Sequence, residues 1–179
     1  TFDRQHNSLR ILGEGAIDKA VFTKAPYDVY KNEIKSIYIG EGITSIVDGA
    51  FEGFSALCEV EIKEGVTVIG SNAFKGTSVS TLVLPSTLTE VGEGAFGGIE
   101  KINDIVYGGT EEKWTIIKIG ENNPALMGEI SFKSVKISFV WDDTTWVVDV
   151  NVGDIPIFDI VPEKEHEDEN KCYVFEGWK

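Results

Sequence analysis

Histidine and cysteine, which supply much of the acid–base, nucleophilic and metal chemistry of proteins, are scarce in this sequence. Its 179 residues contain two histidines, His6 and His166, near opposite ends of the chain, and two cysteines. The motifs HExxH and GxSxG, the phosphate-binding loop GxxxxGK(S/T) and paired CxxC are also missing from it. The sequence therefore predicts a protein that is not an enzyme and has no cofactor or metal site.

The two cysteines, Cys58 and Cys172, lie far apart in the sequence. A disulfide between them would require their Cα atoms to come within about 7 Å, and we expect both thiols to be free. Cys58 has no histidine near it in the sequence, so we expect an ordinary surface or half-buried residue instead of a reactive thiol. Two cysteines neither require nor exclude an oxidising compartment.

Basic residues and long apolar runs are also in short supply. Sixteen lysines and arginines against 30 aspartates and glutamates give a net charge of -14, which repels phosphate backbones, so nucleic acid is not an expected partner. No run approaches the roughly 20 apolar residues of a membrane span, and no membrane insertion is expected.

The chain starts with TFDRQHNSLR, without an initiator methionine or a signal sequence, so we expect a trimmed fragment or a processed chain.

Proline and methionine are rare, with five residues and one, whereas glycine is abundant, with 19. Frequent isoleucine, valine, threonine, phenylalanine and tyrosine favour strands over helices, and the glycines indicate many tight turns. A hydrophobic fraction of 42% is enough to build a core in a chain of this length. We therefore expect a folded, mainly β protein.

A repeated unit accounts for most of the glycines. The segments IKSIYIGEGITSIVDGAF (34–51), LCEVEIKEGVTVIGSNAF (57–74) and VSTLVLPSTLTEVGEGAF (79–96) align without gaps, and INDIVYGG (102–109) matches the first third of the unit. The unit recurs every 22 or 23 residues. This period predicts the stacked coils of a solenoid, because one unit cannot bury its own apolar face. The aligned apolar columns are Ile39, Ile62, Leu84 and Tyr107; Ile46, Ile69 and Val91; and Phe51, Phe74 and Phe96.

Each unit is predicted to contribute one short strand to a parallel sheet. In IKSIYI the alternation sends Ile37 and Ile39 into the core and the residues that precede them outward. The following EGITSIVDGAF is expected to turn at glycine and to add Ile43 and Ile46 to the core. The chain then returns through a bend that phenylalanine fills from inside, so the three phenylalanines should stack as an aromatic column.

One stretch, VGEGAFGG (91–98), contains the order GxGxxG found in loops that bind dinucleotides. That motif needs a buried strand before the glycines, a helix after them and an acidic residue about 20 positions further on. In the repeat, Gly92 aligns with Gly70, and Gly94 aligns with Gly49. No helical pattern follows before the next strand, so the glycines are interpreted as turns of the repeat.

The units resemble the BspA-type leucine-rich repeats of bacterial surface proteins, whose pattern is roughly LxxVxIPxxVxxIGxxAFxGC. The resemblance implies a mainly β leucine-rich-repeat solenoid, and the third unit keeps the family's proline as Pro85. The cysteine that often ends the pattern is replaced by Phe54, Thr77 and Ile99. Cys58 is therefore not the family's cysteine. The matching residues of the second unit are Leu57, Val60, Ile62, Val66, Ile69, Gly70, Ala73 and Phe74.

Both flanks of the repeats resemble end segments of the same family. Residues 1–33 look like its N-terminal cap, in which a hairpin precedes an APW-Y turn, and Tyr27 stands where the family has tryptophan. Residues 108–134 look like its terminal cap. With the repeats at 34–107, the two caps are expected to form one solenoid over residues 1–134.

The terminal cap contains GTEEKW, which predicts the start of a short helix. Thr110 can cap this helix, and Glu111 and Glu112 occupy its first turn, where the helix dipole favours acidic side chains. Three apolar side chains are expected to cover the exposed core of the last coil: Trp114, Ile117 and Leu126.

After Ser134 the repeat ends, and a second module is predicted over residues 135–179. Two alternating runs, 135–140 and 146–152, flank WDDTT and predict a β-hairpin. VNVGDIPIFDIVP and YVFEGW resemble the small β-grasp repeat of internalin B-repeats and the Listeria–Bacteroides repeat family. Members of that family usually continue beyond GW with another strand, so either the chain is cut short at Lys179 or the module is incomplete.

A charge run, EKEHEDENK (163–171), is the one segment that could gather ligands for a divalent cation. Neighbours along an extended chain point in opposite directions, and the EF-hand pattern is absent. A solvated loop is therefore expected, and Asp142 and Asp143 in the hairpin turn are interpreted in the same way. The candidate ligands would be Glu165, His166, Glu167 and Asp168.

The strands of the solenoid should also present outward side chains that the core does not constrain. Tyr38 is the strongest candidate contact residue, because an exposed aromatic supplies apolar area and a hydrogen bond together. The first outward column is Ser36, Glu59, Thr81 and Asp104, and the second is Tyr38, Glu61, Val83 and Val106.

The two family resemblances imply an extracellular or wall-displayed bacterial protein that acts by adhesion or protein recognition. The expected ligands are proteins or glycans, including host extracellular matrix, and the oligomeric state is left open. The alternative is a structural spacer that holds another domain away from the cell surface. An enzyme would instead require a pocket with a perturbed carboxylate or thiol.

Overall fold

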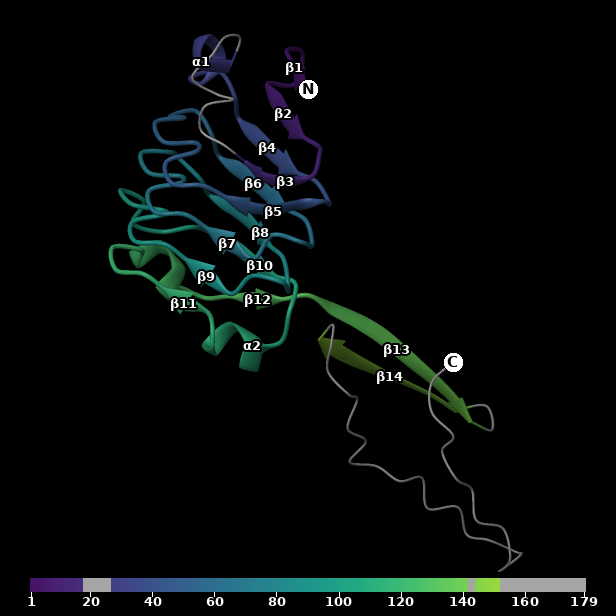
Figure 1. The fold of residues 1–179 in the computed structure, drawn as a ribbon. Coiled ribbons are helices and arrows are strands. Elements are labelled where there is room, and N and C mark those ends of the chain that lie inside the picture. The colour runs from purple at the N-terminus through teal and green to yellow at the C-terminus, as the bar shows by residue number, and fades with distance from the viewer. Residues whose placement is uncertain (18–26, 142–143, 152–179) are drawn as a thin grey trace, which may run out of the picture.

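The computed structural model describes residues 1–17, 27–141 and 144–151. Short strands stack one above another from the N-terminal end to β12, and they form two sheets joined by turns (Figure 1). Buried side chains from both sheets make up a single hydrophobic core. The structure thus confirms the predicted mainly β solenoid of stacked coils.

The first sheet has the strand order β1-β2-β4-β6-β8-β10-β12. Its neighbouring strands are parallel, except for the antiparallel pair β1 and β2. Parallel pairing is what a solenoid requires, because every coil winds in the same direction. The strands are β1 (Phe2–Asp3), β2 (Ser8–Ile11), β4 (Ser36–Ile39), β6 (Glu59–Ile62), β8 (Thr81–Leu84), β10 (Asp104–Tyr107) and β12 (Ser131–Phe132).

The second sheet has the order β11-β9-β7-β5-β3 and is parallel throughout. Its strands are β3 (Gly15–Ile17), β5 (Ile43–Ile46), β7 (Val68–Ile69), β9 (Glu90–Val91) and β11 (Lys118–Ile119). The helical segments of the described chain are short: α1 (Tyr27–Tyr30), α2 (Glu111–Thr115) and the 3-10 helix η2 (Pro124–Met127).

The predicted apolar columns all lie in the core. Every member of the three columns is at most 1% exposed. The rings of Phe51 and Phe74 are stacked with their centroids 5.1 Å apart, and those of Phe74 and Phe96 with their centroids 5.2 Å apart. These separations are close to the roughly 4.8 Å spacing between neighbouring strands. The predicted aromatic column is therefore confirmed.

Equivalent turns of successive coils share one left-handed backbone residue. Glycine and asparagine adopt this conformation more readily than other residues. The coils hydrogen-bond at this position, since the Gly94 N–H donates to the Glu121 carbonyl at 2.8 Å. The shared residues are Gly49 (φ 60°), Asn72 (φ 56°), Gly94 (φ 59°) and Asn122 (φ 63°).

A second column of glycines marks where successive coils come closest. A Cβ added to Gly92 would lie 2.5 Å from the backbone nitrogen of Ser71, and one on Gly70 would lie 2.5 Å from that of Asp48. No helix lies between Gly92 and β10. The glycines of VGEGAFGG therefore serve turns, as predicted, and Gly92 also lets neighbouring coils approach closely.

Gly92→Ala is accordingly expected to lower the free energy of unfolding by about 1–3 kcal/mol, because the backbone must shift to admit the methyl group. Gly128 is the matched control. A Cβ there would lie 3.9 Å from its nearest neighbour, so Gly128→Ala should change stability by no more than about 0.5 kcal/mol. Urea denaturation of both variants checks this, and equal stabilities would contradict the close approach.

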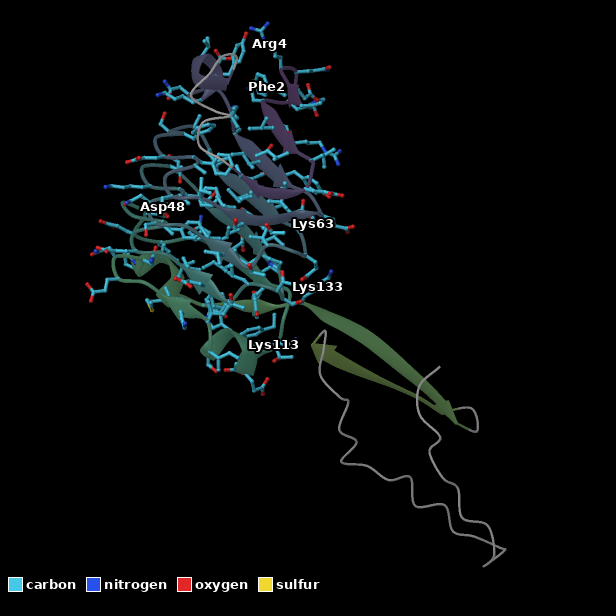
Figure 2. All side chains as sticks on the ribbon, viewed as in Figure 1. Phe2, Arg4, Asp48, Lys63, Lys113 and Lys133 are labelled. Carbon is cyan, nitrogen blue, oxygen red and sulfur yellow. The ribbon has the colours of Figure 1, made fainter. Side chains whose placement is uncertain are left out.

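The N-terminal segment joins both sheets before the first aligned repeat. Its predicted hairpin is formed by β1 and β2, and β2 and β3 then pair in parallel with β4 and β5. Phe2 and Arg4 lie at this end of the stack (Figure 2). Phe2 packs on Tyr30 with ring centroids 5.1 Å apart, and the Arg4 guanidinium lies 4.6 Å from the Tyr30 centroid. The side chain of Tyr27 lies outside the described residues. Stacking thus begins within residues 1–33, which the sequence assigns to a cap.

The predicted helix near the other end of the stack is confirmed as α2. Its N-cap is Thr110, whose hydroxyl oxygen accepts from the Lys113 N–H at 3.4 Å. Trp114 contacts the Tyr107 ring edge to face, with centroids 5.2 Å apart. Ile117 and Leu126 are buried. All three apolar side chains therefore lie in the core or pack against it at this end of the stack.

Asn123 ends a ladder of backbone hydrogen bonds beside the aromatic column. The N–H of Phe74 donates to the Ala95 carbonyl of the next coil at 2.7 Å, whereas the N–H of Phe96 donates to Asn123 Oδ1 at 2.9 Å. Asn123 Nδ2 donates to the carbonyls of Gly92 and Gly120 at 3.0 and 2.8 Å. The Asn123 side chain, 2% exposed, thus supplies the hydrogen-bonding groups that a further coil would otherwise provide.

Tyr107 is expected to make the stability of the folded protein depend on pH in the alkaline range. Burial raises the pKa of its phenol above 10.0, and the charge of Glu64 adds to the rise. Above about pH 10 the unfolded chain therefore releases this proton before the folded protein does, so stability falls as pH rises. Tyr107→Phe should fall less steeply in urea denaturation between about pH 9 and 11. Parallel pH profiles would contradict the raised pKa.

The alternating runs after the solenoid form the predicted hairpin. Strands β13 (Ser134–Trp141) and β14 (Thr144–Asn151) are antiparallel, with Ser134 opposite Asn151 and Trp141 opposite Thr144. The strands extend into WDDTT, further than the sequence predicted. Asp142, Asp143 and residues 152–179 lie outside the described residues, and so do the rest of the predicted β-grasp module and the charge run.

Candidate functional site

The outward side chains of the first sheet form the two predicted columns. Strand register pairs Ser36 with Glu59, Glu59 with Thr81 and Thr81 with Asp104 in the first column. It pairs Tyr38, Glu61, Val83 and Val106 in the same way in the second. All eight side chains are partly or fully exposed. We refer to this surface of the strands from β2 to β12 as the strand face.

The strand face is wider than the sequence predicted. Ser8 and Arg10 of β2 continue the first and second columns at one end, and Ser131 of β12 continues the second at the other. The segment SLRI has the same alternation as SIYI of the first aligned repeat, and this was the signal that could have identified Arg10.

The strand face is hollowed between β2 and β8. A shallow concavity of about 380 Å³ lies over these strands. It brings together six of the eight predicted residues, and Asp104 and Val106 lie beyond it on β10. Its lining is Ser8, Arg10, Ser36, Ile37, Tyr38, Glu59, Val60, Glu61, Thr81 and Val83.

Tyr38 lies between two cations in this concavity. The Arg10 guanidinium is 4.7 Å from the ring centroid, and the Lys63 ammonium is 5.6 Å from it. Lys63 follows β6 and also donates to the Glu61 carboxylate at 2.6 Å. That hydrogen bond, and then the charge of Glu61, raises the pKa of Lys63. Figure 2 shows Lys63 on the side of the stack opposite Asp48.

Glu59 contrasts with Glu61 on the same strand. It is exposed, and within the described part of the chain no hydrogen bond or ion pair is formed by its carboxylate. Glu61 and Glu59 therefore differ in their surroundings, because Glu61 is paired with Lys63 whereas the Glu59 carboxylate faces solvent. The sequence could not distinguish them.

A second hollow, of about 600 Å³, lies on the turn side of the coils. Turn and coil-connecting residues line it, including Asn72, Glu93 and Asn122. The Asn122 side-chain amide donates to Glu93 Oε1 at 3.1 Å. This contact ties together two neighbouring coils.

No group of three or more histidine, cysteine, aspartate or glutamate side chains in the described residues could hold a metal ion. Cys58 is free and half-buried, with its Sγ 3.4 Å from the Lys35 carbonyl oxygen. Cys172 and residues 163–171 lie outside the described residues.

The helices of the described part of the chain are also too short or too polar to cross a membrane.

Comparison with known proteins bears on the fold. Residues 25–138 match the family model described as "BspA type Leucine rich repeat region (6 copies)". No match was found among curated proteins. Among solved structures, the chain is similar to a leucine-rich repeat protein from Eubacterium ventriosum, with 17% sequence identity and a TM-score of 0.37. The similarity covers 63% of this chain and 41% of that protein's chain.

Leucine-rich repeats typically act as non-catalytic scaffolds that bind proteins or have a structural role, and the BspA type is typically associated with the bacterial surface. The family match extends over more than half of the sequence and includes all three aligned repeats. The chain belongs to the BspA-type leucine-rich-repeat family.

Proposed function

We propose that the strand face binds a protein or glycan ligand and that the chain is a non-catalytic adhesion module of the bacterial cell surface. The observation that carries this proposal is the concavity over β2 to β8, which contains Tyr38 and both acids of β6. The core requires none of these outward side chains, so their chemistry is free to serve recognition. Family membership supports the location at the surface.

Two further proposals concern the organisation of the chain. Residues 1–134 form the leucine-rich-repeat unit with its two caps, and residues 135–179 form a β-grasp-like module. The antiparallel pairing of β13 and β14 supports the second, because a hairpin is the expected start of such a module.

The competing function is that of a structural spacer. The unbroken pairing from β1 to β12 supports it, because a continuous ladder of strands makes a stiff element. A spacer needs no ligand, so the two functions differ in whether the strand face has any affinity.

Binding to an array of extracellular-matrix proteins and glycans at physiological salt separates the two functions. Tyr38→Ala/Glu59→Ala should weaken a true ligand by about tenfold or more, as loss of an aromatic contact and a charge does at a binding site. The control is Thr44→Ala/Glu90→Ala, which alters exposed residues of the second sheet and should retain full affinity.

A ligand retained by both double variants would place the site away from the strand face. If the chain binds no protein or glycan on the array, the spacer function is favoured. Melting temperatures of the variants, expected to match that of the unmodified chain, show that a loss of binding is not a loss of folding.

A further inference from the structure

The strand face changes its chemical character in a fixed order along the stack. Arg10 on β2 is exposed and forms no ion pair with any described residue. Two strands further on, β6 carries the unpaired carboxylate of Glu59. Beyond it, Val83 on β8 and Val106 on β10 are half-exposed neighbours in the second column. A ligand lying across the strands would therefore meet a cation, then an anion, then an apolar surface.

The surroundings of Tyr38 favour a peptide over a sugar. A sugar ring that stacks on tyrosine needs a free aromatic face. Arg10 reaches the Tyr38 ring from β2, and Lys63 reaches it from the residue that follows β6, on the other side of β4. The contacts left for a ligand are thus the free donors of Arg10, the phenol oxygen and the carboxylate of Glu59, all of which suit charged peptide side chains.

The spacing of the strands indicates the conformation of such a peptide. Two strand steps, from β2 to β6, span roughly 10 Å, and Glu59 lies one column, about 7 Å, to the side of Arg10, an offset that the two long side chains can bridge. A polyproline II segment rises about 3.1 Å per residue with three residues per turn, so residues i and i+3 point the same way about 9 Å apart. A β-strand instead directs residues i and i+3 to opposite sides. Residue i+6, about 19 Å from residue i, would lie over β10, four strand steps from β2, where it meets Val106 and the neighbouring Val83 of β8.

We propose that the strand face recognises an extended protein segment in polyproline II conformation, with an acidic residue at i, a basic residue at i+3 and an apolar residue at i+6. Arg10 binds the acid, Glu59 binds the base, and Val83 and Val106 contact the apolar side chain. This inference rests on the proposed function, because it names the ligand class of the same surface.

Two capped, proline-rich heptapeptides test the order of charges on the complete chain. The first carries aspartate, lysine and leucine at its first, fourth and seventh positions, and the second exchanges the aspartate and the lysine. We expect the first to bind about tenfold more tightly at low salt, since two attractive charge pairs replace two repulsive ones. The preference should shrink as salt is added.

Arg10→Glu/Glu59→Lys exchanges the two charges on the protein without altering its net charge. This variant should prefer the second heptapeptide by a similar factor. The inference would be overturned if both proteins preferred the same heptapeptide. It would also be overturned if the unmodified chain bound the two heptapeptides equally well, or bound neither measurably.

The results also distinguish a failure of this inference from a failure of the proposed function. If the array yields a glycan whose binding depends on Tyr38 and Glu59 while the heptapeptides are not distinguished, the strand face is a binding site but not for this kind of segment. If the array is silent and neither heptapeptide binds, both the function and the inference are wrong.

Discussion

Phe74→Ala is expected to lower the free energy of unfolding by about 3–5 kcal/mol, the loss typical of a buried aromatic truncated to alanine. Phe74 is the middle ring of the column, fully buried between Phe51 and Phe96. The backbone cannot collapse into the cavity, because the N–H groups of Phe51 and Phe74 each bond to the next coil at 2.7 Å.

Urea denaturation of Phe74→Ala measures this loss, with Phe74→Leu as the control that keeps most of the buried volume. The leucine variant should lose clearly less than the alanine variant. A loss below about 1 kcal/mol for Phe74→Ala would show that the column does not hold the coils together.

Asn123→Leu is expected to lower the free energy of unfolding by about 2 kcal/mol, because it leaves the buried Phe96 N–H without an acceptor, at about 1–3 kcal/mol, and removes two part-buried hydrogen bonds to carbonyls. The Phe96 N–H loses its acceptor and the Gly120 carbonyl loses its side-chain donor, whereas the Gly92 carbonyl keeps the Ala95 N–H at 3.3 Å. Leucine keeps the branched shape of asparagine but is bulkier, so overpacking adds to the loss of hydrogen bonding.

Asn103→Leu is the matched control for this substitution. Asn103 is exposed, so its replacement should change the free energy of unfolding by no more than about 0.5 kcal/mol. Thermal and urea denaturation of the two variants measure the difference. If both lose equally little, Asn123 does not complete the ladder.

The repeat made the solenoid predictable. Residues such as Ile39 and Phe74 recur at a fixed interval, and stacked coils convert that interval into burial on one side and exposure on the other. The same register placed Glu59 and Tyr38 correctly in neighbouring columns of the strand face. The hairpin of β13 and β14 followed from strict alternation.

Other features could not be predicted because they depend on breaks in the period or on side-chain reach. Asn123 binds Phe96 across an interval of 27 residues, since α2 lengthens this coil. Lys63 lies past the end of its strand, and no pattern shows that its side chain returns to Glu61 and Tyr38. Arg10 was missed because residues 1–33 were assigned by resemblance to a cap, although SLRI follows the repeat.

The central claim is that ligands bind on the strand face, and methyl NMR tests it most directly. The tightest ligand found on the array would be titrated into the chain labelled at its valine methyl groups. Val83 and Val106 lie on the strand face, and Val68 is a half-exposed valine on the second sheet. We expect the signals of Val83 and Val106 to shift in a saturable manner while that of Val68 stays fixed. Shifts at Val68 with none at Val83 or Val106, or no ligand on the array to titrate, would contradict the claim.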